Sequence, residues 1–246
     1  MGHAGIGDRV EGFHAVVAAL GAGRVRRLWV ETSRLRHEEY DVAVTSARSA
    51  GVAVETVHDV RPEAVTEAPQ GIIADCRPIP PVDLDEAIDL ATPTALLVLD
   101  RLQDPRNLGA IARSALGAGV PAMVIPQRRS APIGATAFKA AAGALEKVAV
   151  VEVGSPADAL QRLRRRDVWL VGLDGTAERS LFGMDLLAEP VAIVVGAEGS
   201  GVSRLVGDRL DVAARIPMAG ATESLNASVA ASLAVFELAR VRGWIS

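Results

Sequence analysis

Three polar segments of the chain each follow an apolar, β-branched run, and each leads into a helical pattern. Residues 99–114 contain Asn107 and Arg113, residues 194–201 contain Glu198 in a glycine-rich turn, and residues 216–228 contain Ser224 and Asn226. Arginine suits phosphate recognition, because its planar guanidinium can donate two parallel hydrogen bonds to one phosphate. These side chains are therefore candidates for a polar functional site.

Each segment taken alone also fits ordinary helix capping. Asn107 stands where a helix N-cap belongs, because Pro105 would block an earlier start, and Thr222 or Ser224 could cap the last helix. The glycine-rich turn has the order G-x-x-G-x-G, so it matches neither a P-loop nor the G-x-G-x-x-G of dinucleotide-binding folds. A generic nucleotide-binding α/β enzyme stays open at this point.

The elements that would position these segments alternate between strands and helices over residues 93–246. The expected strands are nearly continuous apolar runs, which indicates burial on both faces and a mostly parallel sheet. In such sheets ligands bind at the carboxyl ends of strands, where the three polar segments begin. In the last helix the spacing of Leu225, Val229, Leu233 and Phe236 predicts a buried face. The expected strands are 95–99, 122–125, 148–153, 168–173, 191–195 and 212–216, and the expected helices are 108–116, 135–145, 156–165, a short one after Ser203, and 224–242.

A smaller α/β unit precedes this part of the chain. Residues 1–78 are expected to form helices at 13–20 and 38–50 and strands at 27–30, 53–57 and 71–76. Residues 79–92 begin with prolines and continue with acidic residues and no base, which indicates a linker. The predicted organisation is thus an α/β unit (1–78), a linker (79–92) and a second α/β domain (93–246).

Composition excludes several classes of protein. The chain has 246 residues, a formal net charge of −4 and 50% hydrophobic residues, which supports a large core and excludes global disorder. The single cysteine, Cys76, excludes an intramolecular disulfide and a cysteine-cluster zinc site. The sequence contains no apolar run of about 18 residues that would span a membrane and no recognisable signal peptide, so we expect a cytoplasmic protein.

Taken together, in this order and spacing, the three segments resemble the signature motifs of the SpoU/TrmH class of RNA ribose 2′-O-methyltransferases. The matching stretches are DPRNLGAIARSA at 104–115, IVVGAEGSGVS at 193–203 and IPMAGATESLNASVAASL at 216–233. The stretches EGFHAV at 11–16 and IPQRRSAP at 125–132 are similar to its RlmB subfamily. The usual substrate of that subfamily is a guanosine in 23S rRNA. The resemblance covers residues 93–246, and its motifs are specific.

The resemblance implies an α/β fold with a trefoil-knotted C-terminal SPOUT domain that binds S-adenosylmethionine, forms a homodimer and needs no metal. The N-terminal unit is expected to resemble RNA-binding ribosomal proteins and to recruit the substrate. Its phosphate-contacting surface would be Arg24, Arg26, Arg27, Arg34 and Arg36. The polar site positions implied by the resemblance are Asn107, Arg113, Glu198, Ser224 and Asn226, and the cofactor positions are Leu173, Gly175, Gly196, Ile216, Met218 and Leu225.

These residues suggest how a ribose 2′-OH could be methylated. The hydroxyl is a poor nucleophile until it loses its proton, and all four histidines lie in the first unit, away from the motifs. The resemblance gives Arg113 as the base or as the residue that holds the target phosphate. Because arginine is normally always protonated, we favour electrostatic positioning of the phosphate and the 2′-oxygen. Ser224 and Asn226 would orient the ribose, and Glu198 would fix Arg113 or Asn107.

Three alternatives remain open on the sequence alone. The enzyme could modify a different rRNA site, or it could modify a tRNA. The chain could also be a non-catalytic RNA-binding factor in ribosome assembly. The substrate could be naked 23S rRNA or an assembly intermediate of the large ribosomal subunit.

Overall fold

A seven-stranded sheet forms the centre of the C-terminal part of the computed structural model, which describes residues 5–220 and 224–245. Every pair of neighbouring strands in this sheet is parallel, as the apolar strand pattern predicts. In spatial order the strands are β7 (Ala149–Val153), β6 (Ala122–Pro126), β5 (Ala95–Leu99), β10 (Val191–Val195), β8 (Trp169–Leu173), β11 (Val212–Arg215) and β9 (Arg179–Ser180).

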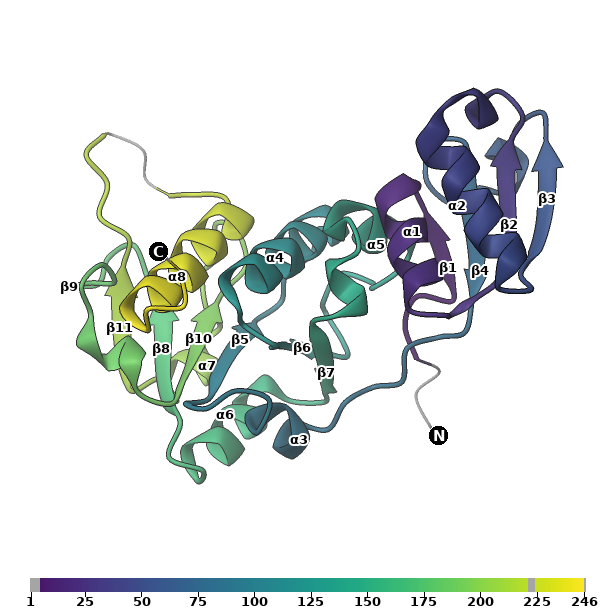
Figure 1. Ribbon diagram of the computed structural model, residues 1–246. Coiled ribbons are helices and arrows are strands. Elements are labelled where there is room, and N and C mark those ends of the chain that lie inside the picture. Colours follow the sequence, from purple (N-terminus) through teal and green to yellow (C-terminus); the bar gives the residue numbers. More distant parts are fainter. Residues whose placement is uncertain (1–4, 221–223, 246) are drawn as a thin grey trace.

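Helices cover both faces of this sheet (Figure 1). One face packs against α4 (Pro105–Ala118), α5 (Ala135–Ala141) and α8 (Ala227–Val241). The other face packs against α3 (Leu84–Ile88), α6 (Pro156–Arg164) and α7 (Arg204–Gly207). Alternate residues of β5 point into the two cores, with Leu97 and Leu99 on the first side and Leu96 and Val98 on the second. Burial on both faces explains why the strand is apolar throughout.

The direction of winding reverses between β5 and β10. The chain runs outward from β5 through β6 to β7, and then returns to the far side of β10 to form β8. β5 and β10 pair directly, with Val195 opposite Leu99 at their carboxyl ends. The loops after these two strands therefore start side by side, at the kind of switch point where open α/β sheets bind ligands.

The N-terminal unit is a four-stranded sheet with two helices. Its strands are β1 (Arg9–Glu11), β2 (Val25–Glu31), β3 (Ala53–Val57) and β4 (Ile72–Cys76), in the order β1-β4-β2-β3. The helices α1 (Phe13–Gly21) and α2 (Glu38–Ser49) pack on one face of the sheet. Short 3-10 turns lie at Arg34–Arg36 and Arg61–Glu63 here, and at Ala144–Glu146 and Asp185–Ala188 in the C-terminal part.

The two parts of the chain pack against each other through α5 and the turn that follows it (Figure 1). Arg24 Nε donates to Glu146 Oε2 at 2.7 Å, and a second hydrogen bond joins the same two side chains. Phe138 is fully buried, and a Cβ on Gly7 would lie 2.2 Å from its ring. The expectation that Arg24 contacts an RNA phosphate is therefore wrong, because its guanidinium is largely buried and ion-paired.

Helix boundaries differ from the sequence-based expectation at three places. Asp104, not Asn107, caps α4: its Oδ1 accepts a hydrogen bond from Arg106 N at 2.8 Å, and Pro105 is the first helical residue. Proline is tolerated there because that position needs no N–H donor. The helix expected at 135–145 stops at Ala141, since Ala142 and Gly143 both have positive φ. The start of α8 is described with the site below.

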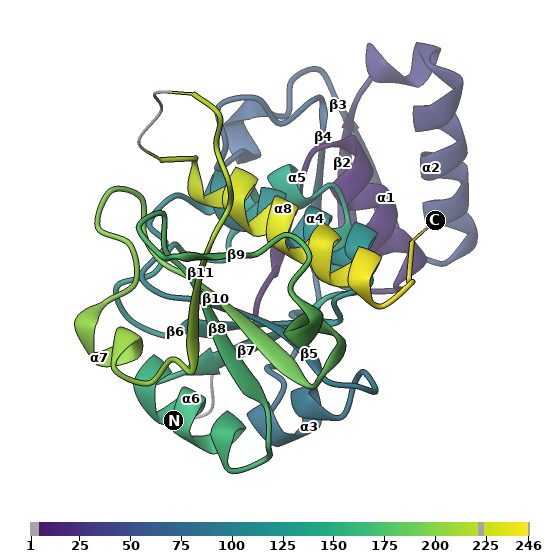
Figure 2. The same cartoon turned by 90° about the vertical axis from the view of Figure 1, so that its left-hand side faces the viewer.

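The face that α8 buries is also different. Ala227, Ala231 and Ala234 lie in the core, whereas the apolar series 229, 233 and 236 is 46%, 38% and 40% exposed. α8 packs on α4, where Ser114 Oγ lies 2.7 Å from Ser232 Oγ. Close approach of two helices favours small side chains, so the alanine side faces inward and the larger residues face outward. Figure 2 views the molecule from this side, with α8 in front.

Two further differences concern short strands. β1 and β9 were not expected, because strands of three and two residues carry too little periodicity to be recognised. The acidic stretch within 79–92 contains α3, and its carboxylates form ion pairs with two arginines. Arg162 on α6 pairs with Asp83 and Asp85, and Arg166, just after α6, pairs with Asp89. In the described ranges, no helix is long and apolar enough to cross a membrane.

Candidate active site

A buried aspartate ties together the loops that follow β5 and β10. Asp100 is 2% exposed, and its Oδ2 accepts a hydrogen bond from Ser203 N at 2.6 Å. Its own backbone N donates to Val195 O at 2.8 Å. These two hydrogen bonds hold the start of the first polar segment against both ends of the glycine-rich turn, at Val195 and Ser203. Sequence reasoning missed Asp100; a charged residue directly after a fully apolar strand is the signal that could have found it.

Glu198 brings side chains from all three polar segments together. Its Oε1 accepts a hydrogen bond from Asn107 Nδ2 at 2.8 Å and another from Asn226 Nδ2. The backbone N of Ala227 lies 3.4 Å from the same oxygen, at the N-terminus of α8. A carboxylate is favourable there because the first turn of a helix has unpaired N–H donors and a positive partial charge. The three predicted residues Asn107, Glu198 and Asn226 thus form one hydrogen-bonded group.

Asn226 also caps α8. Its Oδ1 accepts hydrogen bonds from the backbone N of Ser228 at 2.8 Å and of Val229 at 3.3 Å. The helix begins at Ala227, so the expected start at Ser224 is wrong. Ser224 lies exposed in the segment before the cap, and the other possible cap, Thr222, is outside the described residues.

Gly196 allows the glycine-rich turn to close on itself. Ala197 and Gly201 exchange backbone hydrogen bonds of 3.1 and 2.9 Å across the turn. A Cβ on Gly196 would lie 2.0 Å from the carbonyl carbon of Gly201, so no other residue fits. The turn presents Glu198 at its tip, which explains why a carboxylate occurs within a glycine-rich segment.

Arg113 lies on α4 and faces solvent. Within the part of the chain that the structure describes, its side chain makes no hydrogen bond or ion pair. Glu198 therefore contacts Asn107 and not Arg113, which decides between the two partners that the sequence left open. The Arg113 guanidinium has its full set of donors available for a substrate.

The residues expected to hold a cofactor lie at the carboxyl edge of three adjacent strands, β10, β8 and β11. Leu173, Ile216 and Leu225 are half-buried. Next to Leu173, Asp174 accepts hydrogen bonds from Thr176 N at 2.8 Å and Thr176 Oγ1 at 2.7 Å, which lower the pKa of its carboxyl. The edge thus combines these apolar side chains with Gly175 and Met218, which are exposed, and Gly196, which is half-buried.

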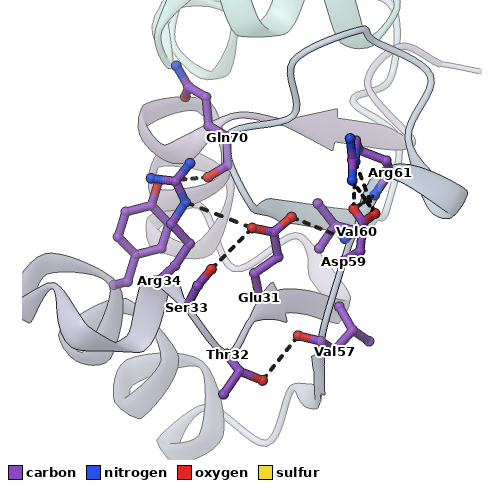
Figure 3. A network of polar contacts seen from close by, with 10 residues as sticks. Glu31, Thr32, Ser33, Arg34, Val57, Asp59, Val60, Arg61 and Gln70 are labelled. Atoms are coloured by element: carbon purple, nitrogen blue, oxygen red, sulfur yellow. Dashed lines mark hydrogen bonds and ion pairs between the residues drawn. The ribbon is translucent and has the colours of Figure 1, made fainter.

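The loops that follow β2 and β3 in the N-terminal sheet form a network of polar contacts (Figure 3). This network includes Arg34, one of the arginines expected to contact RNA phosphates. Glu31 Oε2 lies 4.0 Å from Arg34 Nε, and its Oε1 accepts from Val60 N at 3.3 Å. Three further predicted arginines, Arg26, Arg27 and Arg36, are exposed.

Comparisons with known proteins agree with this arrangement. The SpoU rRNA Methylase family matches residues 94–236, which is more than half of the chain. The chain belongs to the SpoU rRNA methylase family. A second family model, RNA 2′-O ribose methyltransferase substrate binding, matches residues 9–82. In the described ranges, no group of three or more His, Cys, Asp or Glu side chains could hold a metal ion.

Individual members of the SpoU family are similar over nearly the whole chain. An uncharacterized tRNA/rRNA methyltransferase of Synechocystis sp. is 40% identical over 96% of this chain, which spans 63% of that protein's length. The 23S rRNA (guanosine-2′-O-)-methyltransferase RlmB of Xylella fastidiosa strain Temecula1 is 40% identical over 95% of this chain and 96% of its own. The SpoU methyltransferase AviRb of Streptomyces viridochromogenes has a TM-score of 0.79 at 25% identity, covering 96% of this chain and 90% of its own. AviRb has also been solved with the cofactor AdoMet, with a TM-score of 0.78.

Proposed function

We propose that this protein transfers a methyl group from S-adenosylmethionine to the ribose 2′-OH of a guanosine in 23S rRNA, in the cytoplasm. The observation that carries this proposal is the convergence of three family motifs on Glu198, which joins Asn107 and Asn226. The names of relatives that match end to end, such as RlmB of X. fastidiosa, support the substrate. Only RNA offers this site its nucleophile, because DNA lacks the 2′-OH.

The carboxyl edge of β10, β8 and β11 fits an adenosine-containing cofactor. Leu173, Ile216 and Leu225 offer apolar surface for the adenine ring, and the backbone at Gly175, Gly196 and Met218 offers donors and acceptors for its edge and for the ribose. When bound, S-adenosylmethionine supplies the electrophilic methyl group. The protein's task is to hold the 2′-oxygen in line with that methyl group.

The hydrogen bonds of the site support different tasks for its side chains. Both hydrogens of the Asn226 amide are in use, toward Glu198 and toward Asn107 Oδ1 at 3.3 Å, and its oxygen caps α8. Asn226 therefore positions the site, while Ser224 is free to orient the ribose. Asn107 uses one amide hydrogen for Glu198 and keeps the other for the substrate.

Arg113 holds the target phosphate and the 2′-oxygen. Its role is to stabilise negative charge on the oxygen, because a guanidinium donates hydrogen bonds and has no acceptor for the proton. Its exposure and lack of a protein partner in the described residues support this role.

Methyl transfer to purified RNA tests the proposed function. The full-length protein, radiolabelled S-adenosylmethionine and either 23S rRNA or bulk tRNA are incubated under the same conditions. We expect label in the 23S rRNA and background counts in the tRNA. Label only in the tRNA would favour the tRNA alternative, and S-adenosylmethionine binding without transfer to either RNA would favour a non-catalytic assembly factor.

The exposed side of α8 supports a homodimer. Val229, Leu233 and Phe236 form an apolar face on this helix, and Leu116 and Trp244 are exposed on segments that pack beside Phe236 and Gly119. A contiguous apolar face on a monomer surface is typical of a protein interface. Since the site residue Asn226 caps α8, dimerisation through this face would place the interface beside the active site.

The family resemblance also supports a trefoil knot in the C-terminal part. β10 is inserted between β5 and β8, and the chain after β11 returns to pack α8 on α4. A crystal structure that traces the backbone continuously from β8 to α8 would test the knot, which is otherwise rare in proteins.

A further inference from the structure

We propose that Arg101 and Arg129, on two neighbouring loops at the carboxyl edge of the C-terminal sheet, bind phosphates of the RNA strand beside the target nucleotide. This inference rests on RNA as the substrate and adds a substrate-positioning surface to the proposed function. Arg101 follows Asp100, the residue that ties the β5 loop to the exit of the turn carrying Glu198. The surface therefore adjoins the active site.

The two arginines lie side by side because their loops are hydrogen-bonded to each other. Gln103 Nε2 donates to the carbonyl oxygen of Arg101 at 3.2 Å and to that of Arg129 at 2.8 Å. Ala131 N donates to Leu102 O at 2.6 Å. One amide nitrogen thus reaches both arginine carbonyls, at the ends of the paired strands β5 and β6.

Both arginines have a left-handed backbone, with φ of 59° at Arg101 and 59° at Arg129. Glycine adopts this conformation at lower cost than any residue with a side chain. Two adjacent loops therefore carry a long cationic side chain at positions where the backbone favours glycine. Such unfavourable positions cluster at functional sites, which indicates that the side chains are retained for what they bind.

The two guanidinium groups are available to a ligand. In the described ranges the Arg129 side chain has no protein partner, and the only ion pair of Arg101 is from Nε to Asp100 Oδ2 at 3.6 Å. Arg101 Nε is buried without a hydrogen-bond acceptor. By contrast, Arg162 on α6 and Arg166 just after it are paired with carboxylates. Arg129 and the terminal N–H groups of Arg101, which have no acceptor among the described residues, match the phosphates of an RNA backbone.

Glycine substitutions test the inference with little risk to the fold. The variants are Arg101→Gly and Arg129→Gly in the full chain, because glycine suits φ of 59° at both positions. The matched control is Arg165→Ala, which removes an exposed arginine that has no partner among the residues the structure describes. It lies at the end of α6, before β8 and thus at the opposite edge of the sheet. Thermal melting checks the fold of each variant, and titration with S-adenosylmethionine checks the cofactor site.

The measurements are the KM for 23S rRNA, kcat, and the salt dependence of RNA binding. For each glycine variant we expect KM to rise about tenfold, since a charge-assisted hydrogen bond is lost. The slope of log affinity against log salt should become shallower by about 0.7–0.9 for each lost phosphate contact. We expect S-adenosylmethionine affinity and melting temperature to stay at the wild-type values, and Arg165→Ala to change none of these quantities.

Two outcomes separate this inference from the proposed function. If the wild-type protein neither binds nor methylates 23S rRNA, the proposed function fails and the inference with it. If the wild type is active but both glycine variants keep its KM and salt slope, or Arg165→Ala weakens binding equally, the inference alone is overturned. Loss of fold in Arg101→Gly, where Asp100 would lose its ion pair, leaves Arg129→Gly to decide.

Discussion

Glu198 shows how one side chain can organise a site built from three distant segments. Its Oε1 receives hydrogen bonds from Asn107 and Asn226, which lie 91 and 28 residues away in the chain. Both amides are thereby held in one orientation, and the Asn226 amide is also committed to capping α8. Under the proposed function, the substrate meets side chains that this group leaves free, above all Arg113.

The first prediction concerns Arg113. Replacing it with alanine should lower the single-turnover rate of methyl transfer by about 10²–10³-fold, since a preorganised contact to developing negative charge is lost. Lysine should restore little, because an ammonium group cannot contact two oxygens as a planar fork does. Calorimetric titration should show unchanged S-adenosylmethionine affinity, because Arg113 lies on α4 and not on the loops assigned to the cofactor. A near-normal rate of methyl transfer by Arg113→Ala would show that Arg113 does not stabilise the developing negative charge.

At the scale of elements, Glu237 links α8 to the segment before Asp185–Ala188. Hydrogen bonds from the Arg240 side chain, at 2.7 and 2.8 Å, and from Gly183 N, at 2.7 Å, hold the pKa of Glu237 below its ordinary value of 4.5, although burial opposes this. A carboxylate with a lowered pKa contributes stability above its unfolded-state pKa and loses it as the pH falls through the folded-state pKa.

The second prediction follows from the lowered pKa of Glu237. Glu237→Gln should lower the melting temperature at pH 7, and the difference from the wild type should shrink below about pH 4.5 as the wild-type carboxyl becomes protonated. Thermal melting of both proteins between pH 7 and pH 3.5 measures it. A difference that stays constant over this range would show that the charge of Glu237 does not contribute.

Most elements could be predicted from the sequence, and the exceptions have physical causes. Fully buried strands such as β5 and β10 are apolar throughout, so their positions are evident. The orientation of α8 was not predictable by hydrophobicity, because contact with α4 selects alanines and leaves Val229 and Phe236 outside. Local sequence rules place the α4 cap at Asn107 if Pro105 is a barrier to the helix, whereas in the structure Pro105 is the first helical residue and Asp104 is the cap.

The candidate site was predictable only in part. The motif resemblance named Asn107, Glu198 and Asn226, which the structure brings together. It gave no indication of Asp100, because the hydrogen bond from Ser203 N depends on β5 and β10 being neighbours in the sheet. The order of strands is a tertiary property that local sequence patterns do not encode.

At the scale of the molecule, the N-terminal unit is docked on the C-terminal part through Arg24 and Glu146. Cys76 lies close to this pair, and burial raises the pKa of its thiol to about 11. A neutral, buried thiol reacts slowly with alkylating reagents, which attack the thiolate.

The third prediction uses Cys76 to report on this docking. Iodoacetamide should modify the wild type slowly at pH 8 and modify Glu146→Ala faster, because the variant leaves Arg24 buried without its partner and loosens the interface. Asp185→Ala, on a distant 3-10 turn, is a control that should react like the wild type. Equal rates for Glu146→Ala and the wild type would mean that this ion pair does not hold the two parts together.

The fourth prediction concerns the homodimer. Phe236→Glu should convert the dimer to a monomer, since it places a charge in the exposed apolar face of α8. Val42→Glu, at an exposed apolar residue on α2, should leave the dimer intact. Light scattering coupled to size exclusion measures the molar mass. A wild-type mass equal to that of one 25.6 kDa chain would contradict the proposed dimer.

The most direct test of the central claim is the position of the methyl group on rRNA. Nucleoside mass spectrometry and site mapping would be applied to 23S rRNA from cells with this gene, from cells lacking it, and from cells that express only Arg113→Ala. The account predicts one 2′-O-methylguanosine that disappears without the gene, returns with the wild-type protein and does not return with Arg113→Ala. An unchanged 2′-O-methylation pattern in the cells lacking the gene, or a lost methyl group that lay on a base, would contradict it.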